Sequence, residues 1–126
     1  MKKLFSIIVL TLIISTSNAF AFTDVDKTAD CNGPVDILAS LNILKGNDKN
    51  EFKPNNTITR AEFAAIMCRI SGKEESAKTT AKTEFTDVPE QFWGSGYIAC
   101  AKELGIINGY GDGLFGPYDP VTNEQA

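Results

Sequence analysis

Arg60 is the residue whose type and position point most directly to ligand chemistry. It lies in the stretch ITRAEF, residues 58–63, where Thr59 and Glu62 have the spacing of a helix capping box. A cation in the first turn faces the positive end of the helix dipole, where an anion would be favoured. A guanidinium beside free first-turn amides would form a compact anion site, and its planar fork suits a carboxylate. The alternative is a surface arginine, solvated or paired with a loop carboxylate such as Asp48, which would contribute little.

Other chemistries find little support in the composition. The chain has 126 residues and no histidine, so it lacks the usual proton shuttle at neutral pH and the commonest metal ligand. No paired-carboxylate motif stands out in residues 22–126, which argues against an enzyme active site there. Zinc spacing is missing, and the loops NDKNEF and GYGDGLF do not match the ligand spacing of a calcium loop. We therefore expect no catalytic residue, no metal and no cofactor.

Three cysteines, Cys31, Cys68 and Cys100, leave the redox state open. An odd count in an exported protein allows one disulfide with a free thiol, or three reduced side chains. The simplest interpretation is that they are small apolar side chains in or near the core. Bridges between chains are the alternative, and they would make the protein a small secreted disulfide-linked oligomer.

The first 21 residues have the pattern of an export signal. Lys2 and Lys3 precede the apolar run 4–14, and AFA at 19–21 is a small-x-small cleavage site. The run is too short for a relaxed membrane span, so we expect a secreted protein without membrane attachment after cleavage; a retained anchor is the alternative. Removing these two of the 12 basic residues leaves 10 against 16 acidic ones, and the net charge moves from −4 to −6. This balance argues against nucleic acid as a partner and requires a local, shaped site for any anionic ligand.

An internal repeat with a constant offset of 63 residues decides the architecture. The opening FTDV of residues 22–25 returns at 85–88. Further matched positions are Gly33 with Gly96, Gly46 with Gly109, Phe52 with Phe115, Pro54 with Pro117, and Thr59 with Thr122. We place a signal peptide at 1–21, repeat one at 22–72, a polar solvated linker at 73–84, and a second, C-terminally truncated repeat at 85–126.

Each copy has the pattern helix, loop, helix, which predicts a mainly α fold. In copy one, Pro34 opens an apolar stripe with spacings of three and four. In copy two the first helix covers about 93–104, and Gly105, like Asn42 in copy one, suits a left-handed C-terminal cap. The second helix begins at a capping box. Its structural capping pairs are Thr59 with Glu62, and Thr122 with Gln125.

These motifs resemble the S-layer homology repeat. The resemblance rests on FTDV, the first helix with Trp93, GIINGYGDGLFGPYDPVT and ITRAEFAAIMCRI, which fall in the right order over nearly all of residues 22–126. It implies tandem helix-loop-helix repeats that form part of a pseudo-threefold helical assembly. It also implies a non-catalytic module that binds secondary cell-wall polysaccharide, or another peptidoglycan-associated glycan, in grooves between repeats. In that family the glycan often ends in a pyruvylated sugar, whose carboxylate is an anion.

The resemblance also assigns contacts with the polysaccharide to residues of this chain. The arginine of the family's TRAE motif falls on Arg60, and a groove between copies would bring it near Asp87 and Trp93. The full set of polysaccharide-binding candidates is Arg60, Asp87, Trp93, Gly109, Asp24 and Gly46. Asp24 and Asp87 have an alternative role as caps of a first-helix turn.

Two positions depart from the family pattern. Asp30 stands where copy one should have the tryptophan, and Asn123 replaces the copy-two arginine. At most one good groove follows. We expect a wall-anchoring module located in the cell wall or S-layer. Because the sequence stops in the first turn of a helix, we expect a fragment, and the alternative function is the N-terminal anchor of an exported enzyme whose catalytic domain lies beyond residue 126.

Overall fold

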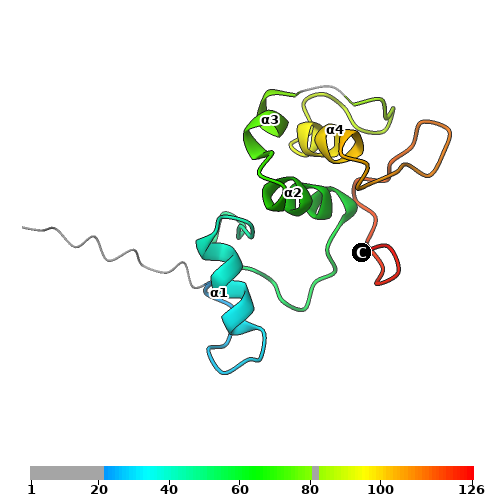
Figure 1. Cartoon of the computed structure of the whole chain (residues 1–126). Helices are drawn as coiled ribbons and strands as arrows, with labels where there is room; N and C mark the ends of the chain where they lie inside the picture. Colours follow the sequence, from blue (N-terminus) through cyan, green and yellow to red (C-terminus); the bar gives the residue numbers. More distant parts are fainter. Residues whose placement is uncertain (1–21, 81–82) are drawn as a thin grey trace, which may run out of the picture.

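The computed structural model describes residues 22–80 and 83–126 (Figure 1). Its helices are α1 (Asn32–Ser40), α2 (Arg60–Ile70), α3 (Glu74–Thr79) and α4 (Ser95–Glu103). Within these ranges, β-structure is limited to two isolated bridges, so the predicted mainly helical fold is confirmed. None of the described helices has the length and apolar character that crossing a bilayer requires. The predicted export signal lies outside the described residues.

The repeat seen in the sequence is reproduced in the backbone. Helices α1 and α4 begin and end at matched positions, 32 with 95 and 40 with 103. Two residues after each helix the backbone turns left-handed, at Asn42 with φ 58° and at Gly105 with φ 70°. The expected left-handed caps are therefore confirmed, because asparagine and glycine tolerate this conformation best.

The aromatic of each opening motif packs on the aromatic of its own loop. The ring centroids of Phe22 and Phe52 lie 5.4 Å apart, and those of Phe85 and Phe115 lie 5.2 Å apart. Such pairs contribute beyond their buried area. Each copy thus closes its loop over its first helix with the same ring pair.

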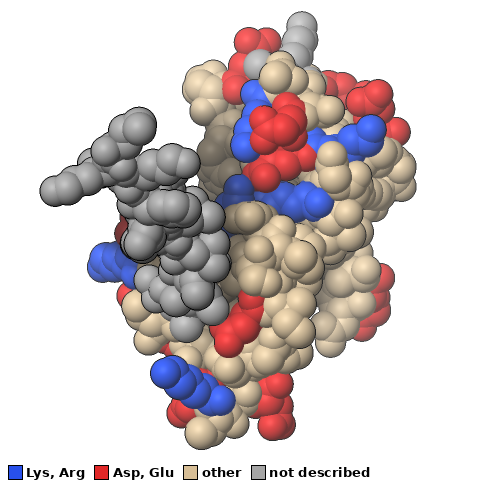
Figure 2. Space-filling view, turned by 60° about the vertical axis from the view of Figure 1, so that its left-hand side comes forward, with Lys and Arg blue, Asp and Glu red and all other residues tan. Residues whose placement is uncertain are grey.

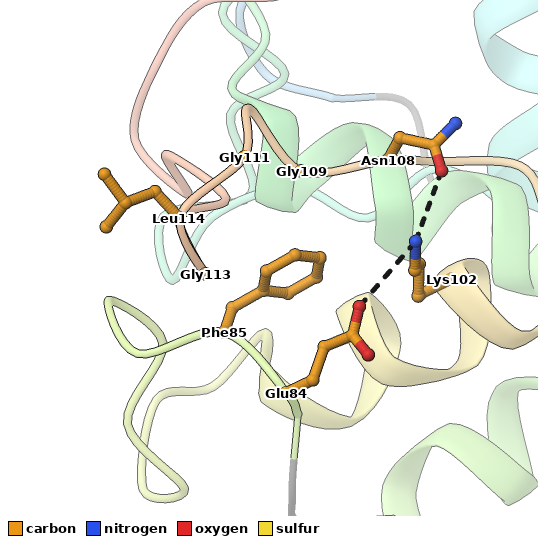
Figure 3. A pocket seen from close by; sticks show the side chains of 8 residues that line it. All are labelled: Glu84, Phe85, Lys102, Asn108, Gly109, Gly111, Gly113 and Leu114. Atoms are coloured by element: carbon orange, nitrogen blue, oxygen red, sulfur yellow. Dashed lines mark hydrogen bonds and ion pairs between the residues drawn. The ribbon is translucent and has the colours of Figure 1, made fainter.

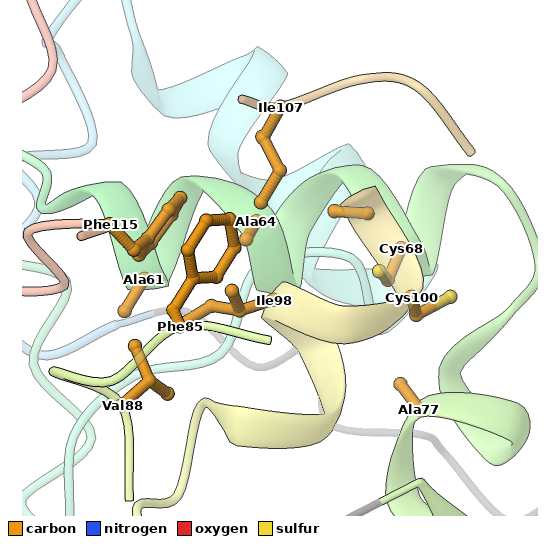
Figure 4. Packing of buried hydrophobic residues seen from close by; sticks show 11 residues of the cluster. Ala61, Ala64, Cys68, Ala77, Phe85, Val88, Ile98, Cys100, Ile107 and Phe115 are labelled. Atoms are coloured by element: carbon orange, nitrogen blue, oxygen red, sulfur yellow. The ribbon is translucent and has the colours of Figure 1, made fainter. Parts of the chain in front are cut away.

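Helix α2 belongs to the first repeat in sequence but packs into the second. Ala61 and Ala64 of α2 are buried in one core together with Phe85, Ile98 and Phe115 (Figure 4). Small side chains on α2 let it approach α4 and the second loop closely. The packing unit is therefore the second helix of one repeat with the first helix and loop of the next.

Helix α1 stands apart from the α2–α4 group (Figure 1) and packs on a small core of its own. Ile37 on α1 and Leu41 at its C-cap are each 61% exposed, whereas Cys100, which matches Ile37 in the repeat, is only 6% exposed. The difference arises because α2 and α3 pack against α4, while no described helix packs against α1.

Residues 73–80, the described start of the segment 73–84, are not fully solvated as we expected of a linker. Helix α3 lies inside this segment and packs on α4, with Ala77 only 2% exposed. A Cβ atom at Gly96 would collide with the carbonyl oxygens of Ala77 and Thr80, so the α3 backbone rests directly on this glycine. Alanine and glycine carry the contact, and they leave no apolar periodicity in the sequence.

Glu74 fastens α3 to its surroundings through one carboxylate oxygen. Its Oε1 accepts hydrogen bonds from Lys45 Nζ at 2.6 Å, the Tyr97 hydroxyl at 3.1 Å and Arg69 Nε at 3.3 Å. The Lys45 bond is the largest influence, and together with the other two it outweighs burial and lowers the pKa of Glu74 to about 2.

This network predicts a specific loss of stability in acid. Because folding lowers the pKa of Glu74 from 4.5 to about 2, the unfolded chain takes up its proton first. The stabilisation is therefore present above pH 4.5 and is lost as the pH falls toward 2. Melting followed by circular dichroism should show a shallower fall of Tm in this range for Glu74→Gln than for the wild type. Glu75→Gln is the matched control, since that side chain is 86% exposed; equal slopes for all three proteins would contradict the prediction.

Candidate functional site

The Arg60 side chain extends from α2 into the loop of the second copy. Its Nε–H donates to the Phe115 carbonyl at 2.8 Å, and Nη2 donates to the Asn108 carbonyl at 2.6 Å. Its Cζ lies 4.5 Å from the ring centroids of both Tyr110 and Phe115. Two carbonyls and two aromatic rings therefore hold the guanidinium at the junction between the copies.

The first-turn amides of α2 are not free, which corrects part of the expected anion site. The Arg60 amide donates to the Asp119 carbonyl at 2.9 Å, and the Ala61 amide donates to the Pro117 carbonyl at 3.1 Å. The carbonyl oxygens of Pro117 and Asp119, at the end of the second loop, thus occupy these donors. Their partial negative charge is favourable at the positive end of the helix dipole. Any anion at this junction would be recognised by the guanidinium and not by the helix amides.

The predicted capping box at the start of α2 is confirmed. The Glu62 amide donates to Thr59 Oγ1 at 3.3 Å, and the Thr59 amide donates to Glu62 Oε2 at 2.8 Å. In copy two, the Thr122 amide donates to Gln125 Oε1 at 3.1 Å. Copy two therefore keeps one of the two capping-box bonds, the one from the N-cap amide to the side chain three residues later.

A hollow of about 290 Å³ opens beside the guanidinium, walled by apolar and aromatic side chains such as Phe63, Ile106 and Tyr110. Arg60 is half-buried there, and the ion pairs of the described residues all involve other cations. The carbonyls of the second loop engage two of its N–H groups, which leaves further donors of the fork unused. The hollow therefore combines an uncompensated cation with flat apolar walls.

A second hollow, of about 450 Å³, lies on the neighbouring side of the same loop (Figure 3). Its cation, Lys102, is already engaged: Nζ lies 3.7 Å from Glu84 Oε1 and donates to Asn108 Oδ1 at 3.2 Å. Because this charge has a carboxylate partner, the second hollow is the weaker candidate for an anionic ligand.

The aspartates of the opening motif bind loop backbone. Asp87 accepts from the amides of Phe115 at 2.9 Å and Gly116 at 2.7 Å. Asp24 repeats the arrangement with the amides of Phe52 at 2.7 Å and Lys53 at 2.6 Å. The alternative expectation that they cap a first-helix turn is wrong, since neither α1 nor α4 has a side-chain N-cap. Their contact with a glycan stays a prediction.

Arg60 and Asp87 both bind the backbone of Phe115. Asp87 accepts from the Phe115 amide, while Arg60 donates to the Phe115 carbonyl. Arg60 of repeat one and Asp87 of repeat two therefore hold the same loop residue, one at its carbonyl and the other at its amide.

Gly46 and Gly109 lie where the opening aromatic touches the loop backbone. A Cβ atom at Gly109 would lie 2.5 Å from Phe85 Cε1, and one at Gly46 would lie 2.9 Å from Phe22 Cε1. Figure 3 shows the Phe85 ring pointing at the loop that carries Gly109. Gly109 also lines both hollows. Both glycines therefore have a packing role whether or not they touch a ligand.

Trp93 does not line the hollow beside Arg60, and its closeness to Arg60 stays a prediction. It is 55% exposed. Its ring lies 5.4 Å from that of Phe92, which lies 5.4 Å from Tyr118, so these three rings form a separate aromatic surface.

Tyr110, whose ring contacts the Arg60 guanidinium, was not among the residues predicted from the sequence. The two tyrosines in the loop GYGDGLFGPYDP were the signal that could have indicated it.

Together these features define a class of protein: a tandem helix-loop-helix module with a cationic hollow where one copy docks on the next. The model of the S-layer homology domain matches residues 21–64 and 84–126. The chain belongs to the S-layer homology family. This domain is a non-catalytic module carried by surface proteins and by enzymes, and family membership places the chain at the cell surface, in the cell wall or S-layer.

Curated relatives include both kinds of protein. A surface layer protein of Brevibacillus choshinensis is 32% identical over 133 residues, covering 100% of this chain and 12% of that protein. A cell surface protein of Thermoanaerobacter kivui is 31% identical over 124 residues, covering 97% and 16% respectively. An endoglucanase of Bacillus sp. (strain KSM-635) is 32% identical over 111 residues, covering 88% and 11%. The chain thus spans only a small part of the length of each relative.

Proposed function

We propose that the repeats anchor an exported bacterial protein to the cell wall by binding a secondary cell-wall polysaccharide in the Arg60 hollow. The ligand group is a carboxylate, such as the pyruvyl group of a modified sugar. The observation that carries this proposal is the half-buried guanidinium, which faces the hollow with unused donors and no carboxylate partner among the described residues.

Electrostatics supports a local site over general adhesion. The chain carries a net charge of −4, and on the face in Figure 2 basic and acidic side chains are intermixed without an extended basic patch. Long-range attraction to an anionic wall is therefore weak, and affinity has to come from short contacts. A charge-assisted hydrogen bond contributes about 1.5–3 kcal/mol, and a bidentate fork adds geometric specificity.

The walls of the hollow suit the remainder of a sugar. Phe63, Ile106 and Tyr110 present apolar and aromatic surface beside Arg60, which fits the C–H faces of a pyranose ring. Asn108 and Gly109 of the loop also line the hollow, which adds polar surface for the hydroxyl groups of a sugar.

The second copy does not repeat this site in the described chain. Asn123 stands at the position matching Arg60 and is exposed, and an amide side chain brings no positive charge. We therefore propose one carboxylate site, at the junction of α2 with the second loop.

A second candidate function is favoured by the enzymes among the relatives. The chain covers 11% of the endoglucanase and 9% of an endo-1,4-beta-xylanase A of Thermoanaerobacterium saccharolyticum. The same module would then hold a catalytic domain at the wall. A longer reading frame containing a catalytic domain distinguishes this function from that of a surface layer protein.

Pelleting with wall sacculi tests the proposed ligand. We expect the exported chain to pellet with intact sacculi and to stay in the supernatant once the polysaccharide has been chemically stripped from the peptidoglycan. Buffer without sacculi controls for aggregation. Undiminished pelleting with stripped sacculi would move the ligand to the peptidoglycan itself and contradict the proposal.

A further inference from the structure

Two thiols from different repeats lie side by side in the core. Cys68 on α2 is 0% exposed and Cys100 on α4 is 6% exposed. The Cys68 thiol donates to the Tyr97 carbonyl, with Sγ and O 3.3 Å apart, and Tyr97 lies one turn before Cys100 on the same helix. Both are free thiols in the structure and belong to one buried core, and Figure 4 shows the two labelled side chains between α2 and α4.

The third cysteine has a different environment. Cys31 is exposed and precedes α1, while Cys68 and Cys100 belong to the core of α2 and α4. Helix α1 does not pack against α2 or α4. The geometry therefore favours one pairing of the three thiols.

We propose that Cys68 and Cys100 form an intramolecular disulfide that ties the second helix of repeat one to the first helix of repeat two. Such a bridge would close the segment 69–99, which contains α3, and would fix the junction at whose other end Arg60 projects. It does not depend on the identity of the glycan.

The chemistry requires an oxidant of the disulfide class, either a disulfide-bearing oxidoreductase or a small-molecule disulfide. One cysteine thiolate attacks the oxidant's disulfide and displaces one of its sulfurs, giving a mixed disulfide. The second thiolate then attacks the protein sulfur of that mixed disulfide and releases the oxidant as a dithiol, or as two thiols. The two cysteines are oxidised by two electrons, and their two protons pass to the sulfurs of the reduced oxidant.

Burial of the Cys68 thiol determines when, relative to folding, the disulfide can form. Desolvation is the largest cause that raises the pKa of the Cys68 thiol to about 12, and the Cys100 hydrogen bond adds to it. Because the thiolate is the nucleophile, exchange is slow once the core has formed. The bridge therefore forms while the chain folds outside the cell, and the closed core then shields it from reductants.

Counting thiols tests the pairing. The full chain is refolded in a mixture of oxidised and reduced glutathione, quenched in acid, denatured without reductant and titrated with a thiol reagent. We expect one reactive thiol per chain, rising to three after reduction, and a peptide cross-link between Cys68 and Cys100 in the mass spectrum. The Cys31→Ser variant should give no thiol before reduction and two afterwards. Three thiols in the refolded wild type, or a cross-link that includes Cys31, would overturn the inference.

Dependence of stability on reductant gives a second measurement. Adding a reducing phosphine should lower the Tm of the oxidised wild type by about 10 °C or more. The double variant Cys68→Ala/Cys100→Ala should melt at the same temperature with and without reductant, whatever its own stability. A wild-type Tm that does not respond to complete reduction would also overturn the inference.

Discussion

Gly96→Ala is expected to lower the free energy of unfolding by about 2–4 kcal/mol. The added methyl group would collide with the backbone carbonyl oxygens of Ala77 and Thr80. Backbone atoms of a helix end cannot turn away as a flexible side chain can, so α3 must move off α4. Its displacement exposes Ala77 and pulls Glu74 from Lys45, Arg69 and Tyr97.

The repeat provides a matched control at Gly33. This glycine occupies the same position in α1, but a Cβ atom there meets nothing within 4 Å. Gly33→Ala should therefore change the free energy of unfolding by no more than about 1 kcal/mol, because the gain in helix propensity is opposed only by the neighbouring Pro34 ring. Urea unfolding followed by circular dichroism measures both variants. Equal effects at the two positions would show that α3 does not rest on α4 as described.

Arg60→Ala is expected to weaken binding to wall sacculi by roughly 10- to 100-fold, the equivalent of one charge-assisted contact of about 1.5–3 kcal/mol. Removing the guanidinium also leaves the carbonyls of Phe115 and Asn108 without their donor, so some loss of loop order accompanies it. Arg60→Lys separates charge from shape: it keeps the cation but lacks the fork, and we expect intermediate binding. Pelleting isotherms with sacculi measure all three proteins.

Lys102→Ala is the control for charge in this experiment. It removes the same unit charge from the neighbouring hollow, where Lys102 is already paired with Glu84. We expect it to bind sacculi like the wild type. Helix content and Tm should be recorded for each variant, so that a weak isotherm from an unfolded chain is not mistaken for loss of a contact.

Local rules predicted the parts of this fold that neighbouring residues determine. The capping box at Thr59 and Glu62 and the left-handed positions at Asn42 and Gly105 follow from spacing and residue type alone. The 63-residue offset indicated that α1 and α4 would be equivalent, and the structure gives them matched bounds.

Contacts between distant segments could not be predicted in the same way. The sequence of α2 is compatible with packing in either copy, and only the tertiary structure shows that its small residues Ala61, Ala64 and Cys68 pack in the second. Asp87 binds backbone amides 28 and 29 residues further along the chain. Arg60 binds carbonyl oxygens, which every residue possesses and which leave no mark in a sequence.

The candidate site was predicted in part for the same reason. An arginine at a helix start is conspicuous in the sequence, which led to Arg60. The occupation of the adjacent amides by the carbonyls of Pro117 and Asp119 is a long-range backbone contact and was not foreseen.

Removing the carboxylate from the glycan, with the protein left intact, tests most directly whether Arg60 binds that group. Sacculi are treated so that carboxylate substituents such as pyruvyl ketals are hydrolysed while the polysaccharide chain stays attached, and isotherms are measured for the wild type and for Arg60→Ala. We predict that the treatment weakens wild-type binding by roughly 10-fold or more and leaves the already weak binding of Arg60→Ala unchanged, because the two changes remove the same contact. Equal losses in both proteins would mean that the carboxylate is bound elsewhere, and would contradict the role proposed for Arg60.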